Sequence, residues 1–304
     1  MNKRKFILSL VITLAVLAII FVVFQLFSSN TGFQDALDSS GTGKINVLVV
    51  GVDKDGTRSD VNMLFSLDPK EKTVNLMSIP RDTRVEFKKG SHGKINACIG
   101  KQNGEELLIE TVKDLTGMPI HNFCKVNFKG LRNIIDILGG VEFDVPMDMD
   151  YDDPAQDLHI HLKKGKQTLN GADAEGLLRF RKGYATGDLG RIDMQQAFLK
   201  ELINQKLSPK YIFKAVPVVK EISKNVETDM SVMYMLKYAW KFRDSDKVEF
   251  NSYTLPGAPK MIGGVSYYLC DEAATENLVR TQFGYSDGES TSSGSTPINE
   301  KVID

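Results

Sequence analysis

A single apolar segment near the N-terminus constrains this chain more than any other feature of its sequence. Residues 6–27 contain no charged side chain and are almost wholly apolar. At about 1.5 Å per residue, a helix of this length crosses a hydrocarbon core about 30 Å thick. Three basic residues at positions 3–5 precede the segment, and the next basic residue is Lys44. The positive-inside rule therefore predicts one transmembrane helix, with residues 1–5 in the cytoplasm and the rest of the chain extracellular.

A cleaved signal peptide is the competing interpretation of this segment. The apolar run is long for a signal peptide, and the sequence at its end, FQLFSSN, offers no good small-x-small cleavage site. No cysteine stands just after the run, which argues against a lipoprotein. We therefore expect an uncleaved anchor that holds the protein at the cell membrane.

The charge outside the predicted membrane helix argues against one class of partner. Without residues 3–5, the remaining 35 basic and 39 acidic residues give a formal net charge of −4. A nucleic-acid-binding protein is normally basic, and an extracellular position argues against that role more strongly. The three cysteines do not indicate a disulfide framework. A Cys98–Cys124 bridge and buried free thiols are the two alternatives.

Beyond the anchor, strand and helix patterns alternate loosely without an internal repeat. Residues 28–44 are small and polar, as in a linker, and 286–304 form a polar tail that we expect to be disordered. The periodicity predicts strands in INVLVVGVD, MLFSLDP, TVNLMSIP, VEFDVP, VEFNSYTLP and VSYYLC. It predicts helices in EELLIETVKDLTG, FKGLRNIIDILGG, ADAEGLLRFRKG, RIDMQQAFLKELINQKL and DEAATENLVRTQF, and roughly over 210–224 and 231–243. We infer one α/β domain over 45–285, with a central mixed sheet flanked by helices.

The first group of candidate site residues lies in GVDKDGTRSD, at the end of a predicted buried strand. Ligands of α/β sheets usually meet the chain at the carboxyl ends of strands, and Asp53, Arg58 and Asp60 fall in this loop. Two neighbouring carboxylates suit a hard cation such as Mg²⁺, whose shell is completed by phosphate oxygens and water. A solvated turn rich in Asp and Gly is an equally good alternative. An EF-hand is excluded, because the twelfth position from Asp53 is Leu64 rather than Glu.

The second group lies in SIPRDTRV, where Arg81 and Arg84 flank Asp82 at the end of another predicted strand. The guanidinium group is a planar fork of donors that matches phosphate oxygens and stays charged. The alternative is an Arg–Asp pair at the surface, which is frequent and weak.

The third group lies in RFRKGYATGDLGRIDMQQ. It contains Arg179, Arg181, Asp188, Arg191 and Gln195. Arg191 and Gln195 are four residues apart and share one face of the predicted helix. Arg191 also stands at the predicted helix start, where backbone N–H groups attract anions. Arginines in three separate loops are unusual for an acidic domain, and an anionic ligand explains them.

Two further signals are weaker. Lys94, in KINA, would lie near an anion if the loops converge, although a lone Lys is usually solvated. His159 and His161, in HIH, would share one side of a strand, but two histidines alone are poor evidence for a metal site. The sequence contains no P-loop, HExxH or GxSxG motif.

In their order along the chain, several of these segments closely resemble the motifs of the LytR-CpsA-Psr family of Gram-positive cell-wall proteins. The matching sequences are NVLVVGVD, RSD, SIPRDTRV, KINA, ILGGVEFDVP, LLRFR and GDLGRIDMQQ. The resemblance extends roughly over 45–207 and is specific, because separate motifs agree in order and spacing. Two departures are a shorter loop between GVD and RSD than in some relatives, and Met194 where a basic residue is common.

The resemblance implies an extracytoplasmic phosphotransferase. Such an enzyme would move an anionic glycopolymer, such as wall teichoic acid or a capsular polysaccharide, from undecaprenyl pyrophosphate to peptidoglycan with Mg²⁺, or with Mn²⁺ in its place. It also implies a hydrophobic tunnel for the polyprenyl chain with arginines at its mouth. Asp53 and Asp60 match the metal-associated carboxylates, and together with Arg81 they are the expected catalytic residues. The expected pyrophosphate-binding residues are Arg58, Arg81, Arg84, Lys94, Arg179, Arg181, Asp188, Arg191 and Gln195.

Direct transfer to a sugar hydroxyl is the expected chemistry, because no Ser or Cys stands in a convincing nucleophile setting. Three other functions are alternatives: a non-catalytic protein that binds and presents a polyprenyl phosphate lipid, a lipid pyrophosphatase, and a transcription regulator. Topology, acidic charge and the lack of a helix-turn-helix pattern argue against the regulator.

Overall fold

The computed structural model describes residues 43–53, 55–88, 90–154, 158–206, 217–218, 221, 225–231, 234–235, 238, 241–242 and 248–285. From Lys44 onward these residues belong to one compact unit. The predicted membrane anchor, nearly all of the linker, most of the two helices expected after residue 209 and the tail lie outside the described residues. In the part of the chain that is described, no helix is long and apolar enough to cross a membrane.

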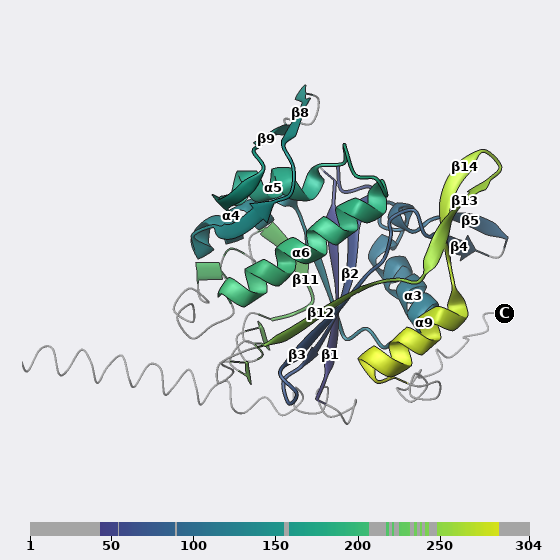
Figure 1. Ribbon diagram of the computed structural model, residues 1–304. Helices are drawn as coiled ribbons and strands as arrows, with labels where there is room; N and C mark the ends of the chain where they lie inside the picture. Colours follow the sequence, from purple (N-terminus) through teal and green to yellow (C-terminus); the bar gives the residue numbers. More distant parts are fainter. Residues whose placement is uncertain are drawn as a thin grey trace, which may run out of the picture. The chain divides into compact units, whose positions relative to one another are not determined.

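A six-stranded mixed sheet forms the centre of this unit (Figure 1). Its strands lie in the order β11 (Val226–Thr228), β6 (Asn122–Val126), β1 (Ile45–Val52), β2 (Ser59–Asp68), β3 (Thr73–Ser78) and β12 (Glu249–Thr254). Strand β2 is antiparallel to β1 and β3, whereas β6 is parallel to β1 and β12 is parallel to β3. The central mixed sheet expected from the sequence is confirmed.

Helices cover both faces of the sheet (Figure 1). They are α3 (Gly104–Thr116), α4 (Phe128–Leu138), α5 (Gly171–Arg179), α6 (Asp188–Lys206) and α9 (Glu272–Leu278), with the 3₁₀-helix η1 (Ile95–Ala97) and the π-helical turn η4 (Val279–Phe283). Helices α3 and α9 lie on one side, and α4, α5 and α6 lie on the other. The five α-helices were predicted and η1 was not, and α6 begins at Asp188, three residues earlier than expected. Asp188 and Arg191 therefore share its first turn.

Strand β1 shows how the two faces of the sheet differ. Leu48 and Val50 are fully buried and pack in one cluster with Leu108 of α3. Because successive residues of a strand point to opposite faces, Val49 and Gly51 face the other side, where they line an apolar pocket. One face of the sheet is therefore closed by packing, and the other retains a space beneath α4 and α6.

Four two-stranded antiparallel sheets accompany the central sheet. They are β4 (Arg84–Lys88) with β5 (Ser91–Lys94), β7 (Val141–Val145) with β10 (Gly165–Leu169), β8 (Met149–Asp153) with β9 (Leu158–Leu162), and β13 (Gly257–Ile262) with β14 (Val265–Cys270). The hairpins β8–β9 and β13–β14 project from the body of the unit (Figure 1).

All three cysteines are free thiols. Cys98 and Cys124 are buried and Cys270 is half-buried, so the alternative of buried thiols holds and the Cys98–Cys124 bridge is absent. Burial, with a smaller contribution from the Asp229 carboxylate, raises the pKa of Cys124 to about 12. Such a thiol is protonated and unreactive near neutral pH.

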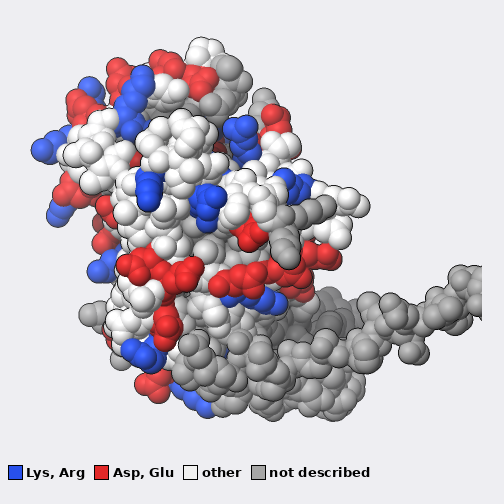
Figure 2. All heavy atoms as spheres, turned by 90° about the vertical axis from the view of Figure 1, so that its right-hand side faces the viewer, with Lys and Arg blue, Asp and Glu red and all other residues white. Residues whose placement is uncertain are grey.

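The face formed by α3 and α9 is acidic. Figure 2 shows Asp and Glu side chains gathered in a band on the side of the molecule that lies to the right in Figure 1. Helix α3 exposes Glu106, Glu110 and Asp114, and α9 exposes Glu272 and Glu276. This charge disfavours an anionic polymer on that face.

Candidate active site

The β1–β2 hairpin carries the first three candidate residues. Asp53 directly follows β1, Arg58 directly precedes β2, and Asp60 is the second residue of β2. Asp53 Oδ1 accepts hydrogen bonds from the backbone N–H groups of Thr57, at 3.0 Å, and Arg58, at 3.3 Å. Gly56, with a φ of +68°, supplies the left-handed conformation of the turn. The alternative expected from the sequence was a structural turn rich in Asp and Gly. Such a turn explains the hydrogen bonds of Asp53 Oδ1.

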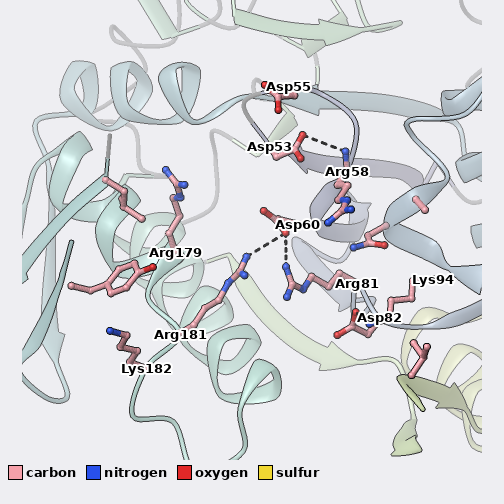
Figure 3. A pocket seen from close by; sticks show the side chains of 15 residues that line it. Asp53, Asp55, Arg58, Asp60, Arg81, Asp82, Lys94, Arg179, Arg181 and Lys182 are labelled. Carbon is pink, nitrogen blue, oxygen red and sulfur yellow. Dashed lines mark hydrogen bonds and ion pairs between the residues drawn. The ribbon is translucent and has the colours of Figure 1, made fainter. Parts of the chain in front are cut away.

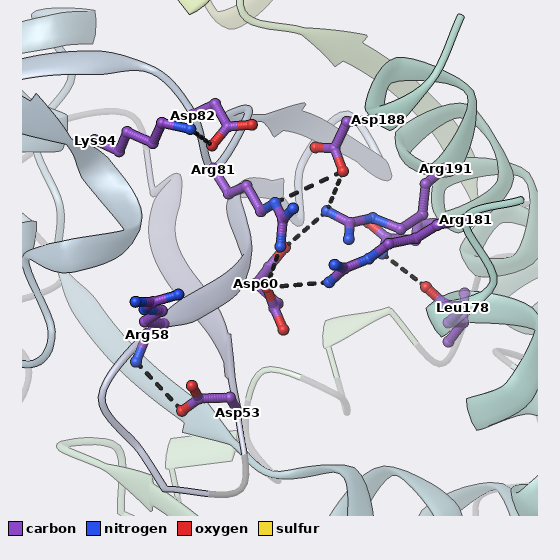
Figure 4. A network of polar contacts seen from close by, with 11 residues as sticks. Asp53, Arg58, Asp60, Arg81, Asp82, Lys94, Leu178, Arg181, Asp188 and Arg191 are labelled. Carbon is purple, nitrogen blue, oxygen red and sulfur yellow. Dashed lines mark hydrogen bonds and ion pairs between the residues drawn. The ribbon is translucent and has the colours of Figure 1, made fainter. Parts of the chain in front are cut away.

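One carboxylate oxygen of Asp60 contacts two arginines that come from distant parts of the chain (Figure 4). Asp60 Oδ1 lies 2.7 Å from Arg81 Nη1 and 3.3 Å from Arg181 Nη2. Arg191 Nη2 lies 2.9 Å from Asp188 Oδ1 and donates a hydrogen bond to the backbone oxygen of Asp60 at 3.3 Å. Arg81 Nε lies 3.7 Å from the same Asp188 oxygen. Three sequence motifs therefore meet in one network.

The environments of two of these arginines differ. Arg191 is only 2% exposed, and burial, helped by repulsion from Arg181 and Arg81 and opposed by Asp188, lowers its pKa to about 10. Burial also acts to lower the pKa of Arg81, but the carboxylates of Asp188 and Asp60 outweigh it and raise that pKa. Both guanidinium groups are charged at neutral pH. Neighbouring carboxylates compensate the burial of the charge fully at Arg81 and only partly at Arg191.

Arg81 borders a polar cavity of about 1050 Å³ (Figure 3), whereas Arg191 lines the apolar pocket described below and not this cavity. The predicted residues that line it are Asp53, Arg58, Asp60, Arg81, Lys94, Arg179 and Arg181. Its volume is at the upper end of the usual range for ligand pockets, about 300–1,000 Å³. The cavity is thus large enough for several phosphate or sugar groups, and its arginines favour anions.

A second, apolar pocket of about 160 Å³ lies between the open face of the sheet and helices α4 and α6. Its walls are mainly the side chains of Val49, Val61, Met63, Phe65, Val126, Phe128, Leu131, Leu178 and Leu199. Asp60, Arg179 and Arg181 line this pocket and the polar cavity alike. The two spaces therefore adjoin at charged side chains. Together they suit a ligand with an anionic head, and the volume of the apolar pocket accommodates the first part of an apolar tail.

The carboxylates of Asp53 and Asp60 fit a divalent cation in their chemistry. Both residues line the polar cavity. The hydrogen bonds and ion pairs of each involve Oδ1, and within the described residues neither Oδ2 accepts a hydrogen bond. Two carboxylate oxygens beside an anion site suit Mg²⁺, which takes one or two carboxylates and completes its shell with phosphate oxygens and water.

Two other predicted residues, Lys94 and Arg179, are held by partners of their own. Lys94 Nζ lies 2.7 Å from Asp82 Oδ1. Arg179 Nη1 lies 2.8 Å from Glu175 Oε1, and its guanidinium carbon lies 4.6 Å from the centre of the Phe128 ring. These contacts fix the side chains at the wall of the cavity.

Gln195 and Arg84 differ from the expectation. Gln195 lines the apolar pocket rather than the polar cavity, and its Nε2 donates to the backbone oxygen of Leu178 at 3.1 Å. Arg84 lines neither space, and its guanidinium carbon lies 6.0 Å from the centre of the Tyr267 ring. The structure therefore does not bring Arg84 together with the other arginines.

The cavity also has lining residues that the sequence did not single out. These are Asp55, Asp82, Asn96, Ala97, Tyr151, Leu158, Lys182 and Val265. Asp82, Asn96 and Lys182 lie within or next to predicted motifs, so their positions in the sequence could have identified them as cavity residues. Tyr151, Leu158 and Val265 come from two peripheral hairpins, and no local pattern places them here.

Comparison with known proteins gives concordant matches. The model of the LytR_cpsA_psr family matches residues 27–283. The polyisoprenyl-teichoic acid–peptidoglycan teichoic acid transferase TagV of Bacillus subtilis (strain 168) is 33% identical over 239 residues, which make up 76% of this chain and 61% of TagV. This chain therefore spans less than two thirds of the length of TagV. The TagU transferase of the same organism is 30% identical over 239 residues, which make up 77% of this chain and 76% of TagU.

The fold also matches a solved structure. The crystal structure of B. subtilis TagV superposes with a TM-score of 0.68 and 32% sequence identity. The match covers 78% of this chain and 95% of that chain.

Proposed function

Because this chain belongs to the LytR_cpsA_psr family, we propose that it transfers an anionic glycopolymer from a polyprenyl-pyrophosphate carrier to peptidoglycan. The names of TagV and TagU describe teichoic acid transfer to peptidoglycan. Wall teichoic acid is therefore the first cargo in this proposal, and a capsular or other wall polysaccharide is the second.

The proposal rests mainly on the junction between the polar cavity and the apolar pocket. The polar cavity and the apolar pocket share Asp60, Arg179 and Arg181. A polyprenyl-pyrophosphate saccharide has the same order of parts, with an apolar chain, two phosphates and a sugar. Bound across the junction, it would place its chain against β1, β2 and α4, its phosphates at the arginines and its saccharide in the polar cavity.

The proposed reaction is a direct displacement at phosphorus. The oxygen of an acceptor sugar hydroxyl forms a bond to the phosphorus that carries the glycopolymer. The bond from that phosphorus to the bridging oxygen breaks, and its electron pair leaves on the polyprenyl phosphate. The hydroxyl proton passes to a carboxylate of the cavity. The products are a phosphodiester between glycopolymer and peptidoglycan and a polyprenyl phosphate.

The arginines would stabilise the charge that develops on the leaving phosphate. Arg81, Arg181 and Arg191 are already oriented by Asp60 and Asp188, so little reorganisation is needed when the ligand binds. Preorganised donors of this kind are usually the largest contribution to catalysis. In the same proposal Asp53 and Asp60 hold Mg²⁺, which when bound would neutralise further phosphate charge.

We further propose that residues 6–27 anchor the protein in the cell membrane with residues 45–285 outside the cell. The apolar run and the basic residues 3–5 support this arrangement. A membrane anchor would hold the protein at the bilayer that contains the carrier lipid.

The test uses the full chain reconstituted in lipid nanodiscs. It is supplied with a polyprenyl-pyrophosphate saccharide, a peptidoglycan oligomer and Mg²⁺, and mass spectrometry searches for a phosphodiester-linked conjugate. Asp60→Ala and Arg81→Ala are the site variants, and Arg280→Ala, at an exposed position of η4, is the matched control.

A conjugate made by the wild type and by Arg280→Ala, but by neither site variant, is the expected result. Release of polyprenyl phosphate without conjugate would favour a lipid pyrophosphatase. Tight carrier binding with neither product, across several saccharides, would favour a protein that only presents the lipid.

A further inference from the structure

The outer face of the β8–β9 hairpin gathers four carboxylate and imidazole side chains outside the arginine cavity. In the antiparallel register Asp150 lies opposite His161, and Asp152 lies opposite His159. Because side chains alternate along a strand, all four project from the same face, and all four are exposed. The hairpin itself stands out from the body of the unit (Figure 1).

Three of these side chains converge on one point. His159 Nδ1 lies 2.5 Å from Asp152 Oδ1, and His161 Nε2 lies 3.5 Å from the same oxygen. Ligand atoms of Asp152, His159 and His161 all lie within 4.8 Å of one another. Among the described residues, this is the one group of three His, Cys, Asp or Glu side chains that meets this criterion.

The fourth side chain orients one of the other three. Asp150 Oδ1 lies 2.7 Å from His161 Nδ1. A hydrogen bond at Nδ1 leaves the Nε2 lone pair of the neutral imidazole directed toward Asp152. Histidines that bind metals commonly donate their other ring N–H to a carboxylate in this way.

We propose that Asp152, His159 and His161 bind one Zn²⁺ ion on the β8–β9 hairpin, with Asp150 as the residue that positions His161. Zinc bonds of about 2.0–2.2 Å to nitrogen and oxygen place tetrahedral ligand atoms roughly 3.3 Å apart. The exposed side chains reach that spacing by small rotations. Two imidazoles and one carboxylate favour zinc over Mg²⁺ or Ca²⁺, which prefer oxygen ligands alone.

The ion would stabilise a wall of the cavity from outside. Tyr151 alternates with Asp150 and Asp152 on β8, and Leu158 precedes His159 on β9. Tyr151 and Leu158 line the polar cavity, and Lys182 Nζ lies 4.4 Å from the centre of the Tyr151 ring. A zinc bridge between β8 and β9 would therefore hold the hairpin in the register that presents these two residues.

The test measures zinc affinity of the full chain, without a polyhistidine tag, by competition with a chromophoric chelator. Excess Mg²⁺ is present throughout to compete for sites made only of carboxylates. The variants are His161→Gln, Asp152→Asn and Asp150→Asn. His92→Gln is the matched control, because His92 is exposed on β5 and lies outside the group. Co²⁺ replaces Zn²⁺ in a second measurement, which reads coordination from visible absorption.

One zinc per chain is expected for the wild type and for His92→Gln. His161→Gln and Asp152→Asn should lose this binding, and Asp150→Asn should weaken it by about 10–100-fold, the usual loss for a residue that orients a ligand. Zinc should also raise the melting temperature of the wild type and not that of His161→Gln. No zinc binding by the wild type, or equal affinity in His161→Gln, would overturn the proposal.

Discussion

Arg81 and Arg181 share a single oxygen of Asp60, with Nη1 of the first at 2.7 Å and Nη2 of the second at 3.3 Å. The carboxylate therefore occupies the position of an anion between two guanidinium groups. A phosphate oxygen is also negatively charged and accepts hydrogen bonds from guanidinium groups in the same way. Asp60 thus keeps both arginines in place before a ligand arrives.

Removal of the Arg81 charge should slow transfer strongly without unfolding the protein. We expect Arg81→Gln to lower kcat by about 100–1,000-fold, the usual effect of losing one preorganised donor. The Arg81 and Asp60 side chains are each 23% exposed, so the melting temperature should change little. Thermal unfolding and conjugate formation, measured on the same preparation, check both parts. Wild-type turnover, or a variant that does not fold, would contradict the assignment.

The apolar pocket should discriminate carriers by chain length. Leu131→Gln places an amide in the wall of this pocket and should weaken binding of a long polyprenyl pyrophosphate by about tenfold or more. Binding of a short-chain analogue should be unchanged, because its head contacts only the charged residues. Met261→Gln is the control, at a side chain that is 63% exposed. Equal losses for both chain lengths would show that Leu131 acts through the fold instead.

Arg191 should be more important for ligand binding than for stability. Its pKa is lowered to about 10 and lies below the value of an unfolded chain, so the folded state holds this proton less firmly than the unfolded state. The resulting cost to stability is fully present below about pH 10 and decreases as the pH rises through that value. Arg191→Gln should therefore leave the melting temperature at pH 7.5 unchanged or higher, while carrier affinity falls. A marked loss of stability would show that the charge is well compensated without a ligand.

The thiols should be inert in the folded protein. At pH 8, a rise in pKa from 9.0 to about 12 reduces the thiolate fraction of Cys124 about a thousandfold. Burial raises the pKa of Cys98 and Cys270 as well. Iodoacetamide should label none of them quickly in the native state and all three in urea, as counted by mass spectrometry. Rapid labelling of native Cys124, or a missing thiol in urea, would disagree with the structure.

The central part of the fold could be predicted because its signals are local. A nearly continuous apolar run is typical of a central strand, and β1 is such a strand. Glycines with positive φ end α3 at Gly117 and α4 at Gly139, where the sequence pattern also ends them. Strand β6 was missed, because NFCKV is short and mixed in character. It forms by pairing with β1, about 75 residues earlier, and with β11, about 100 residues later, and such contacts leave no trace in a short window of sequence.

The sequence predicted many of the residues that line the candidate site, but not its geometry. Spacing alone left Asp53 and Arg81 open to structural interpretations, and the motif resemblance identified the set. The structure then showed that Arg84 is directed toward Tyr267 rather than into the cavity. Arg81 lies in the turn before β4 and Arg84 is the first residue of that strand, so the local backbone directs their side chains differently. The pairing of Asp150 and Asp152 with the two histidines likewise depends on the register of β8 with β9, which the sequence did not specify.

The hairpins around the cavity have a consequence for how such a protein diversifies. Lys94 of β5, Tyr151 of β8, Leu158 of β9 and Val265 of β14 line the cavity. Each of these strands belongs to a two-stranded sheet that is separate from the six-stranded sheet. Insertions or deletions in the hairpins leave the hydrogen bonds of the six-stranded sheet intact. Related proteins can therefore differ in the sugars that their hairpins contact while they keep the same charged residues in the cavity.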